Sequence, residues 1–422
     1  MKLRVCIVSE IFHPEDTGGM GRQAHALAER LIGKGLDVDA VTRRISPTSP
    51  SRERVGLVDV TRLPPAGVLK GRGWAALLPV GWFSLRLLLW LLRRTNTYDV
   101  LLVQGTKTML IPVFLAGLIS RSRRVLKIDA FTDIGEEVGA DSLAKMGLSP
   151  GSPTVRLWGF VRNQLLKRAD GIIAISQEIR AVLLTRGITA GKIHSIPNGI
   201  DFNRFQRLPS SRKEGLRTQL GLPLERILVI FTGRLSRGKG LAMLLEVWRS
   251  LVSNRSDLHL LLVGSGRDSY DDCEQELRSF VSSRHLEHCV QFTGQVEDVT
   301  QYLQAADIFV LPSEAEGFAL ALIEAMGVGK PCIVTRVGVA SEVVRDRDNG
   351  IVIPVRDAAA LTEAFSWMLQ HADRWEEMGS LARKSAVDFC EIDSVTERYV
   401  SLFRSLRELS HSTRPEVSGG DR

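Results

Sequence analysis

Short apolar runs alternate with longer amphipathic segments along the first half of the chain. The short runs have strand length and are rich in Val, Ile and Leu, whereas the longer segments place apolar residues at helical spacing. A strand that is apolar on both faces is typical of a parallel sheet covered by helices on each side. We therefore expect strands at 3–9, 38–42, 55–63, 99–103, 124–128 and 171–175, with helices between them, the first at 22–33.

The second half of the chain repeats this alternation after a turn-rich junction at 196–201. It predicts a helix at 241–252 and strands at 227–231, 258–263, 289–293, 307–311 and 332–335. The fold expected is α/β, with two tandem doubly wound, Rossmann-like domains that face one another across a cleft. We place the domains at 1–205 and 206–392, a helix that returns to the first domain at 393–409, and a disordered polar tail at 410–422.

One segment, 74–94, stands apart because it is nearly all apolar as far as Leu92 and ends in two arginines. Its length approaches that of a membrane span. Pro79 shortens the helix, however, and Arg86 would be costly in the middle of a bilayer, so a spanning helix is disfavoured. The alternation demands a helix here, which predicts a buried helix. A shallow membrane contact through its Trp and Arg side chains is the alternative.

Charge is spread unevenly over the 422 residues. Residues 1–205 hold 29 Lys/Arg and 17 Asp/Glu, a net of +12, whereas the rest of the chain has a net charge of −5. A basic first half suggests an anionic partner. No nucleic-acid-binding motif is present, so we expect a membrane surface or a lipid phosphate and no nucleic acid.

Five cysteines are widely spaced and form no CxxC pair, so neither a disulfide framework nor a zinc site is indicated. The chain opens on a strand rather than on a signal peptide. We expect a cytoplasmic protein that is peripheral at the cytoplasmic face of a membrane.

Two carboxylates bracket a glycine-containing loop and the helix that follows the strand at 307–311. Glu316 and Glu324 are eight residues apart, about two helical turns, so we expect them on one face of a helix. Backbone N–H groups at Gly317, Phe318 and Ala319 would lie at the helix start, where an anion can bind. A sugar nucleotide, which carries hydroxyls and phosphates, fits such a site. The alternative is a helix capped by acidic residues.

The segment 233–240 follows a strand, opens a helix and nearly matches the phosphate-binding P-loop pattern. The exception is Gly240, which stands where a Ser or Thr hydroxyl should hold magnesium. A P-loop NTPase is therefore the alternative rather than the main hypothesis. Arg234 and Lys239 still place two cations at a helix start, where they can neutralise a diphosphate without a metal.

Two DxD strings begin at Asp37 and Asp346, and such strings can hold a metal on a nucleotide diphosphate. We interpret both as surface features, because the first opens a strand and the second precedes an Asn-Gly turn. No metal or other cofactor is expected.

An ordered set of motifs resembles the retaining glycosyltransferase family 4, which has the two-domain GT-B architecture. The set runs through nearly the whole chain and comprises Gly18-Gly19, Pro197-Asn198-Gly199-Ile200-Asp201, Gly233-Arg234, Lys239-Gly240, Gly264-Ser265-Gly266, Glu316-Gly317-Phe318 and Glu324-Ala325-Met326.

The resemblance implies roles for the matching residues. Arg234 and Lys239 would bind the donor diphosphate, Glu316 would orient the donor sugar, and Glu324 would bind the ribose hydroxyls. Backbone groups of the donor site would come from Gly18, Gly19, Gly233, Gly264, Gly266, Gly317, Phe318, Ala319 and Leu320, and the segment that ends at Val296 would cradle the base.

Two residues of the first half are candidates for the sugar or acceptor side. Asp129 stands near the place where many family members have a His. It would either hydrogen-bond a sugar hydroxyl or serve the structure. His13 lies close to Gly18 and would either face the acceptor or be solvated.

The function expected is a retaining, metal-independent glycosyltransferase that uses a nucleotide-diphosphate sugar. A lipid-linked or membrane-proximal glycan is the expected acceptor, because of the basic first domain and the segment 74–94. A sugar-nucleotide epimerase of similar architecture and a catalytically inactive binding module are further alternatives, and the intact Arg234, Lys239, Glu316 and Glu324 argue against the last.

Overall fold

The computed structural model describes residues 2–15, 19–65, 77–105, 109–134, 152–267 and 271–412. The chain divides into two compact units, Met1–Gly199 with Ile392–Arg422, and Ile200–Glu391. The expected boundary at 205 therefore lies within the second unit, which begins at the turn-rich junction itself. Gly18, a predicted donor-site residue, and most of the tail at 410–422 lie outside the described residues.

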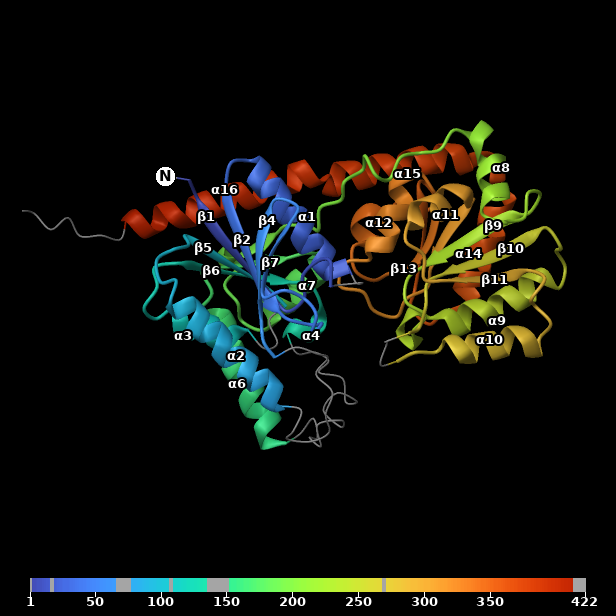
Figure 1. The fold of residues 1–422 in the computed structure, drawn as a ribbon. Helices are drawn as coiled ribbons and strands as arrows, with labels where there is room; N and C mark the ends of the chain where they lie inside the picture. The colour runs from blue at the N-terminus through green and yellow to red at the C-terminus, as the bar shows by residue number, and fades with distance from the viewer. Residues whose placement is uncertain are drawn as a thin grey trace, which may run out of the picture. The chain divides into compact units, whose positions relative to one another are not determined.

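The first unit is an eight-stranded sheet covered by helices (Figure 1). Its strands are β1 (Arg4–Ser9), β2 (Asp37–Arg43), β3 (Arg52–Val55), β4 (Val58–Leu63), β5 (Val100–Gln104), β6 (Arg123–Ile128), β7 (Gly171–Ala174) and β8 (Ile193–Ser195). Its helices are α1 (Gly19–Gly33), α2 (Leu77–Leu92), α3 (Leu110–Ala116), α4 (Phe131–Ile134), α6 (Pro153–Lys167), α7 (Gln177–Thr185), the 3₁₀ turn η2 (Ala190–Lys192) and α16 (Ile392–Ser412).

The strand order β3-β4-β2-β1-β5-β6-β7-β8 confirms a doubly wound sheet. All neighbouring strands are parallel except β3 and β4, and the order reverses between β1 and β5. The central strands β1 and β5 are buried apart from Arg4 at the start of β1, as their apolar sequences require. The chain leaves β1 at this reversal point. The segment from Glu10 onward therefore lies where ligands bind in doubly wound sheets.

The single strand expected at 55–63 is wrong. The chain instead forms an antiparallel hairpin, with β3 paired to β4 and a turn at Gly56, whose φ is +58°. Because β3 is the polar sheet edge Arg-Glu-Arg-Val, it carries no apolar run that could have predicted it.

The carboxy-terminal helix α16 packs against α1 in the first unit. Lys34, which directly follows α1, is 2.6 Å from Glu397, and Arg30 of α1 is 3.6 Å from Asp393. Val395, Tyr399 and Phe403 of α16 are buried. Helix α16 therefore closes the first unit, although it follows the second unit in sequence.

Helix α2 corrects the prediction of a buried helix. Phe83 and Leu87 are buried, whereas Leu78, Trp82, Leu85 and Leu89 are exposed. The helix is thus apolar on both its buried and its exposed side. Among the described residues, no helix is long and apolar enough to cross a membrane.

The second unit is a parallel six-stranded sheet with the order β11-β10-β9-β12-β13-β14. Its strands are β9 (Ile227–Thr232), β10 (Leu258–Val263), β11 (Val290–Gly294), β12 (Ile308–Leu311), β13 (Cys332–Thr335) and β14 (Gly350–Ile353). Its helices are α8 (Ser210–Gln219), η3 (Arg237–Lys239), α9 (Leu241–Val252), α10 (Glu274–Ser283), α11 (Val299–Ala305), α12 (Leu320–Gly327), α13 (Ala340–Val343), α14 (Ala358–Gln370), η4 (Ala372–Arg374) and α15 (Trp375–Cys390).

The strand order of this sheet reverses between β9 and β12. Strands β9 and β12 are fully buried apart from the first residue of β9, so their ends are held firmly by the core. The loops that follow these two strands are 233–240 and 312–319. A ligand of a doubly wound unit is expected at this point.

Candidate active site

Backbone contacts join the two loops at the reversal point of the second unit. The N–H of Glu314 donates to the carbonyl oxygen of Gly238 at 2.9 Å. Gly240 has a φ of +67°, and a Cβ placed on it would lie 2.0 Å from the carbonyl oxygen of Pro312. Only glycine allows these backbones to approach so closely. Position 240, where a P-loop needs a hydroxyl side chain, therefore has no room for one.

An ion pair links the predicted cation of one loop to the predicted carboxylate of the other. Lys239 Nζ lies 2.6 Å from Glu316 Oε1, and both side chains are largely buried. The hydroxyl of Ser313 donates to the same Oε1 at 2.8 Å. Two donors on one oxygen fix the orientation of the Glu316 carboxylate and leave Oε2 to other partners.

Arg234 lies on the same loop as Lys239 and is exposed. Among the described residues, its guanidinium has no ion-pair partner. An arginine offers five N–H donors in a planar fork that matches phosphate oxygens. The loop after β9 thus presents Arg234 to solvent beside Lys239, which is bound to Glu316, while the exposed Arg237 of the same loop pairs with Glu276.

Glycine turns bring the ends of β9 and β10 together beside these cations. A Cβ on Gly264 would lie 1.9 Å from the carbonyl oxygen of Gly233, and the φ of Gly264 is +138°. Gly266 donates its N–H to Glu274 at 2.9 Å. The glycines at 233 and 264 therefore let the two backbones meet at the carboxyl edge of the sheet, whereas Gly266 is buried and its N–H is already bound to Glu274. Val296 follows β11 at the same edge and is half-buried.

The start of helix α12 differs from the expectation. The helix begins at Leu320, with Ala319 in the left-handed conformation (φ +73°) as its N-cap. Glu316 therefore lies in a loop, and the argument that it shares a helix face with Glu324 is wrong. Glu324 lies within α12 and is half-buried. The left-handed residue turns the chain sharply, which the Ala-rich sequence did not signal.

Backbone donors gather at this turn. Among the described residues, the N–H groups of Gly317, Phe318, Ala319 and Leu320 have no hydrogen-bond acceptor. Phe318 is buried and stacks on Phe389, with ring centroids 6.5 Å apart, which anchors the loop. Donors that are held in place without an acceptor suit an anion or a sugar hydroxyl.

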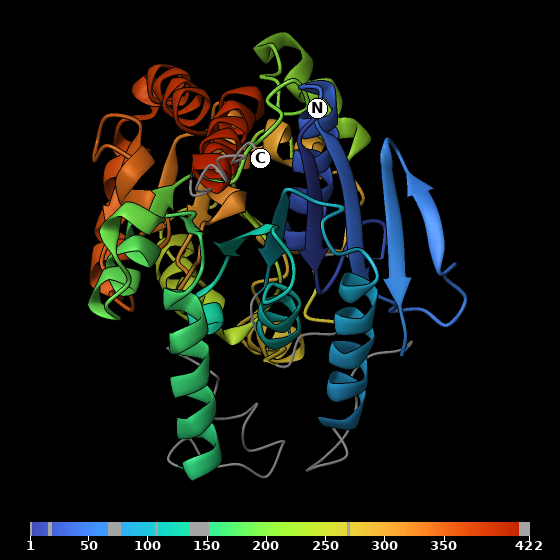
Figure 2. The same cartoon turned by 90° about the vertical axis from the view of Figure 1, so that its left-hand side faces the viewer.

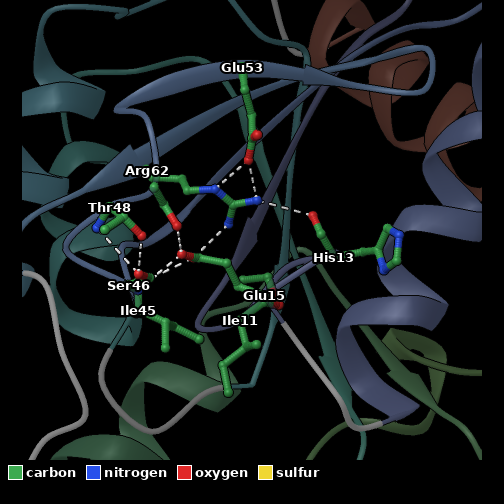
Figure 3. Close-up of polar contacts among 10 residues, drawn as sticks. Ile11, His13, Glu15, Ile45, Ser46, Thr48, Glu53 and Arg62 are labelled. Atoms are coloured by element: carbon green, nitrogen blue, oxygen red, sulfur yellow. Dashed lines mark hydrogen bonds and ion pairs between the residues drawn. The ribbon is translucent and has the colours of Figure 1, made fainter. Parts of the chain in front are cut away.

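In the first unit, a buried arginine holds the chain that leaves β1 (Figure 3). The side chain of Arg62 has no exposed surface and lies 3.0 Å from Glu15, and it also pairs with Glu53. It donates to the carbonyl oxygen of His13 at 3.1 Å. The His13 backbone is thereby fixed directly before the glycine loop, of which Gly19 is the first residue of α1.

Glu15 is the centre of this network. Its carboxylate accepts hydrogen bonds from the backbone of Ile45 (3.2 Å) and Ser46 (3.0 Å) and from the hydroxyl of Ser49. Burial alone would raise the pKa of Glu15, but these hydrogen bonds and the Arg62 charge outweigh it, and the pKa lies below its usual range. The carboxylate is therefore ionised at neutral pH and keeps Arg62 paired.

Asp129 forms an ion pair within the first unit. Its Oδ1 lies 2.9 Å from Lys127 Nζ, and both side chains are buried. Burial raises the pKa of Tyr399 on α16, and the nearby charge of Asp129 raises it further. One oxygen of Asp129 is thus held by Lys127, whereas Oδ2 is buried without a hydrogen-bond partner among the described residues, so both interpretations of Asp129 stay open.

The DxD carboxylates are engaged by protein groups. Asp37 lies 3.2 Å from Arg4, and Asp39 accepts a hydrogen bond from the buried Tyr98 hydroxyl at 2.7 Å, so Asp39 is not simply solvated as expected. Asp346 accepts from the backbone of Val352. Among the described residues, no group of His, Cys, Asp and Glu side chains is arranged to hold a metal ion.

Sequence reasoning missed two residues that hold this chemistry in place, Ser313 and Arg62. Ser313 is fully buried next to the strand end, and its position three residues before Glu316 was the available signal. Arg62 lies in the strand Val-Asp-Val-Thr-Arg-Leu, where a buried cation needs a carboxylate partner. Glu15 is 47 residues away in sequence, and Glu53 is nine residues away on the other strand of a hairpin that the pattern did not predict.

Two family models match the chain in tandem. A model described as Glycosyltransferase Family 4 matches residues 17–204, and one described as Glycosyl transferases group 1 matches residues 226–371. D-inositol 3-phosphate glycosyltransferase 1 of Catenulispora acidiphila is 26% identical over 410 residues, which are 93% of this chain and 92% of the relative. The lipopolysaccharide core biosynthesis mannosyltransferase LpsB of Rhizobium meliloti is 31% identical over 50% of this chain and 58% of its own.

Solved structures match over nearly the whole chain. Sucrose-phosphate synthase from Thermosynechococcus elongatus aligns with a TM-score of 0.80 at 23% identity, over 97% of this chain and 100% of its own. Anabaena Alr3699/HepE in complex with UDP-glucose aligns with a TM-score of 0.73 at 20% identity, over 96% and 100%. At these identities the match concerns the fold, and it confirms the two tandem α/β domains.

Proposed function

Since the chain belongs to glycosyltransferase family 4, we propose that it transfers a sugar from a nucleotide-diphosphate donor with retention of configuration and without a metal ion. The observation that carries the proposal is the Lys239–Glu316 pair at the reversal point of the second sheet, with Arg234 beside it. This point joins two cations to a fixed carboxylate and to a row of backbone donors. A sugar diphosphate has the matching groups, which are phosphate oxygens at one end and hydroxyls at the other.

The residues of the second unit divide the donor between them in this proposal. Arg234 and Lys239 bind the diphosphate, and the glycine turn from Gly233 to Gly266 lets it approach the backbone. Glu316 and the amides of residues 317–320 hold the sugar, Glu324 binds the ribose, and the segment up to Val296 holds the base. Crystal structures of the similar Anabaena protein contain UDP and UDP-glucose, which supports a donor of this class.

The chemistry requires charge stabilisation more than a nucleophile. The acceptor hydroxyl oxygen bonds to the anomeric carbon while the bond from that carbon to the phosphate oxygen breaks. The nucleoside diphosphate leaves with the electron pair, and its phosphate oxygen takes the acceptor proton. Cations that are already in place where this charge develops lower the barrier. Attack and departure on the same face retain the anomeric configuration.

The acceptor proposed is a lipid-linked or membrane-proximal glycan, at the cytoplasmic face of a membrane. The first unit holds the groups that would meet it, among them His13 and the glycine loop at residues 18 and 19. The basic character of residues 1–205 supports an acceptor that carries phosphate or lies near anionic lipid.

Donor binding can be tested by thermal-shift measurements with UDP-, GDP-, ADP- and TDP-sugars, each with and without EDTA. We expect one sugar nucleotide to raise Tm equally in both conditions. Lys239→Ala should abolish that shift and the transfer while the chain stays folded, whereas Arg237→Ala, which changes an exposed neighbouring cation, should retain both. Turnover by the Lys239 variant would refute the role of Lys239.

The P-loop NTPase alternative makes the opposite prediction. It requires stabilisation by a nucleoside triphosphate that depends on magnesium. The contact of Gly240 with Pro312 opposes it, because it leaves no space for the metal-binding hydroxyl. An epimerase would consume the donor when no acceptor is present, which product analysis distinguishes.

A further inference from the structure

Three helices of the first unit, α2, α3 and α6, carry an unusual share of exposed apolar side chains. Among the described residues, fifteen large apolar side chains are exposed, and ten of them lie on these helices or on the turn that follows α3. Helix α3 packs against both α2 and α6, so the three helices are neighbours. In Figure 2 they face the viewer in the lower half, with α2 and α6 on either side.

The exposed residues of α2 form one stripe. Leu78, Trp82, Leu85 and Leu89 follow the spacing of one helix face, and Leu78 is 75% exposed. The opposite side of α2 is packed, because Phe83 and Leu87 are buried. The helix is thus fixed to the fold through one apolar side and presents a second apolar side to its surroundings.

The other two helices extend this stripe. Ile111 and Leu115 of α3 and Leu118 on the following turn are exposed, the last by 78%. On α6, Phe160 is 62% exposed, with Leu157 one turn before it. A monomeric soluble protein rarely leaves so many large apolar side chains together in water. We call the exposed sides of α2, α3 and α6 the apolar helical face.

Charge on this face has a single sign. The three helices hold four cationic residues, Arg86, Arg156, Arg162 and Lys167, and no Asp or Glu. Arg86 and Arg156 are exposed on α2 and α6. The guanidinium of Arg86 lies over the ring of Trp82 at 4.7 Å, which places an amphipathic aromatic ring and a cation together.

We propose that the apolar helical face docks on an anionic lipid bilayer. Leu, Trp and Phe side chains would enter the boundary between headgroups and acyl chains, while the arginines meet lipid phosphates. A second copy of the chain is a poorer partner, because two such faces would bring arginines together without a carboxylate between them. The fixed inner side of α2 limits the contact to the bilayer surface.

Docking of this kind is separate from the donor site, since no residue of the face belongs to the second unit. It would hold the enzyme beside a lipid-linked acceptor, if the acceptor proposed above is right. Vesicle binding and sugar transfer therefore test different statements, and either one can fail without the other.

The test is flotation of the full chain with vesicles of pure phosphatidylcholine or of phosphatidylcholine with phosphatidylglycerol, at low and at high salt. We expect binding to the anionic vesicles that weakens with salt. Trp82→Ser with Leu118→Ser should weaken it by roughly 100-fold or more, because each large apolar side chain is worth about tenfold or more. Leu57→Ser is the matched control, since Leu57 is equally apolar, exposed on the β3–β4 turn and outside the face.

Absence of binding by the unaltered chain to either vesicle would overturn the proposal. Equal binding by the double variant and by Leu57→Ser would also overturn it. A chain that is dimeric in gel filtration and becomes monomeric in the double variant would assign the face to self-association instead. Thermal unfolding of each variant verifies that the substitutions leave the fold intact.

Discussion

The contact between Gly240 and Pro312 allows a sharp test of how the donor site is assembled. Replacing Gly240 by Ala adds one methyl group at a φ of +67°, where it would lie 2.0 Å from a backbone oxygen. A side chain in the left-handed conformation costs about 1–2 kcal/mol. Relief of the overlap requires the loop 312–316 to move away from the loop 237–240, and this movement breaks the hydrogen bond from Glu314 to Gly238.

The free energy of unfolding should therefore fall by about 2–3 kcal/mol, since a lost hydrogen bond adds roughly 1 kcal/mol to the strain. For a unit of this size the loss corresponds to about 4–12 °C in Tm. Circular dichroism during heating measures Tm, and isothermal calorimetry measures the affinity for the sugar nucleotide. We expect the affinity to fall as well, because Lys239 and Glu316 lie on the two loops that separate.

Gly215→Ala supplies the matched control. Gly215 lies in helix α8, its added Cβ would meet no atom within 4 Å, and alanine favours the helix. That variant should unfold at the same temperature or slightly higher and bind the donor normally. If Gly240→Ala matched the control in both Tm and affinity, the loops would not be coupled as described. Gly240→Ser should behave as Gly240→Ala does, and a gain of magnesium-dependent triphosphate binding would support the NTPase instead.

Three further predictions follow from buried polar groups. Ser313→Ala removes one of the two donors to Glu316 Oε1 and should lower kcat/KM by roughly tenfold with little change in Tm. The control Ser211→Ala, at an exposed position, should leave kcat/KM unchanged. Equal kcat/KM values for the two variants would exclude a positioning role for Ser313. Arg62→Met leaves Glu15 without its buried cation and should lower the free energy of unfolding in a denaturant titration by about 3 kcal/mol, against a negligible change for the exposed Arg54→Met. Burial lowers the pKa of His259 from 6.5 to about 4. The imidazole is therefore protonated at a higher pH in the unfolded chain than in the folded one, and stability is lost as the pH falls from 6.5 to 4. Between pH 7 and pH 5 the free energy of unfolding falls by about 2 kcal/mol because of this residue. In Tm measurements, His259→Leu should be less sensitive to acid than the unaltered chain, and equal sensitivity of the two would refute the assignment.

The parallel strands could be predicted from the sequence because burial on both faces requires continuous apolar runs. Strands β1, β5, β9 and β10 follow such runs to within a residue or two. Strand β3 lies at an exposed edge and β8 has only three residues, so neither leaves a hydrophobic signal. The exposed side of α2 was also unpredictable, because an apolar sequence does not say which of its faces the fold covers.

The candidate site was predictable where chemistry and sequence order coincide. Gly233, Arg234, Lys239 and Glu316 stand next to strand ends that the pattern had already located. The left-handed Ala319 and the pairing of Arg62 with Glu15 were not predictable, because both depend on contacts between distant parts of the chain. For Asp129 the sequence left a sugar contact and a structural role open, and its ion pair with Lys127 could not be predicted from its position after β6.

The two places where the chain passes between the units lie side by side. Ile200 donates its N–H to the carbonyl oxygen of Cys390 at 2.9 Å, and it pairs with Glu391 in a β-bridge. The second unit is consequently inserted into the first unit's sequence, and its two ends adjoin. A gene segment encoding 200–391 could be exchanged between related enzymes, or its ends joined by a few residues, without cutting either sheet. Under the proposed division of donor and acceptor binding between the units, such an exchange would produce hybrid enzymes with new sugar–acceptor combinations.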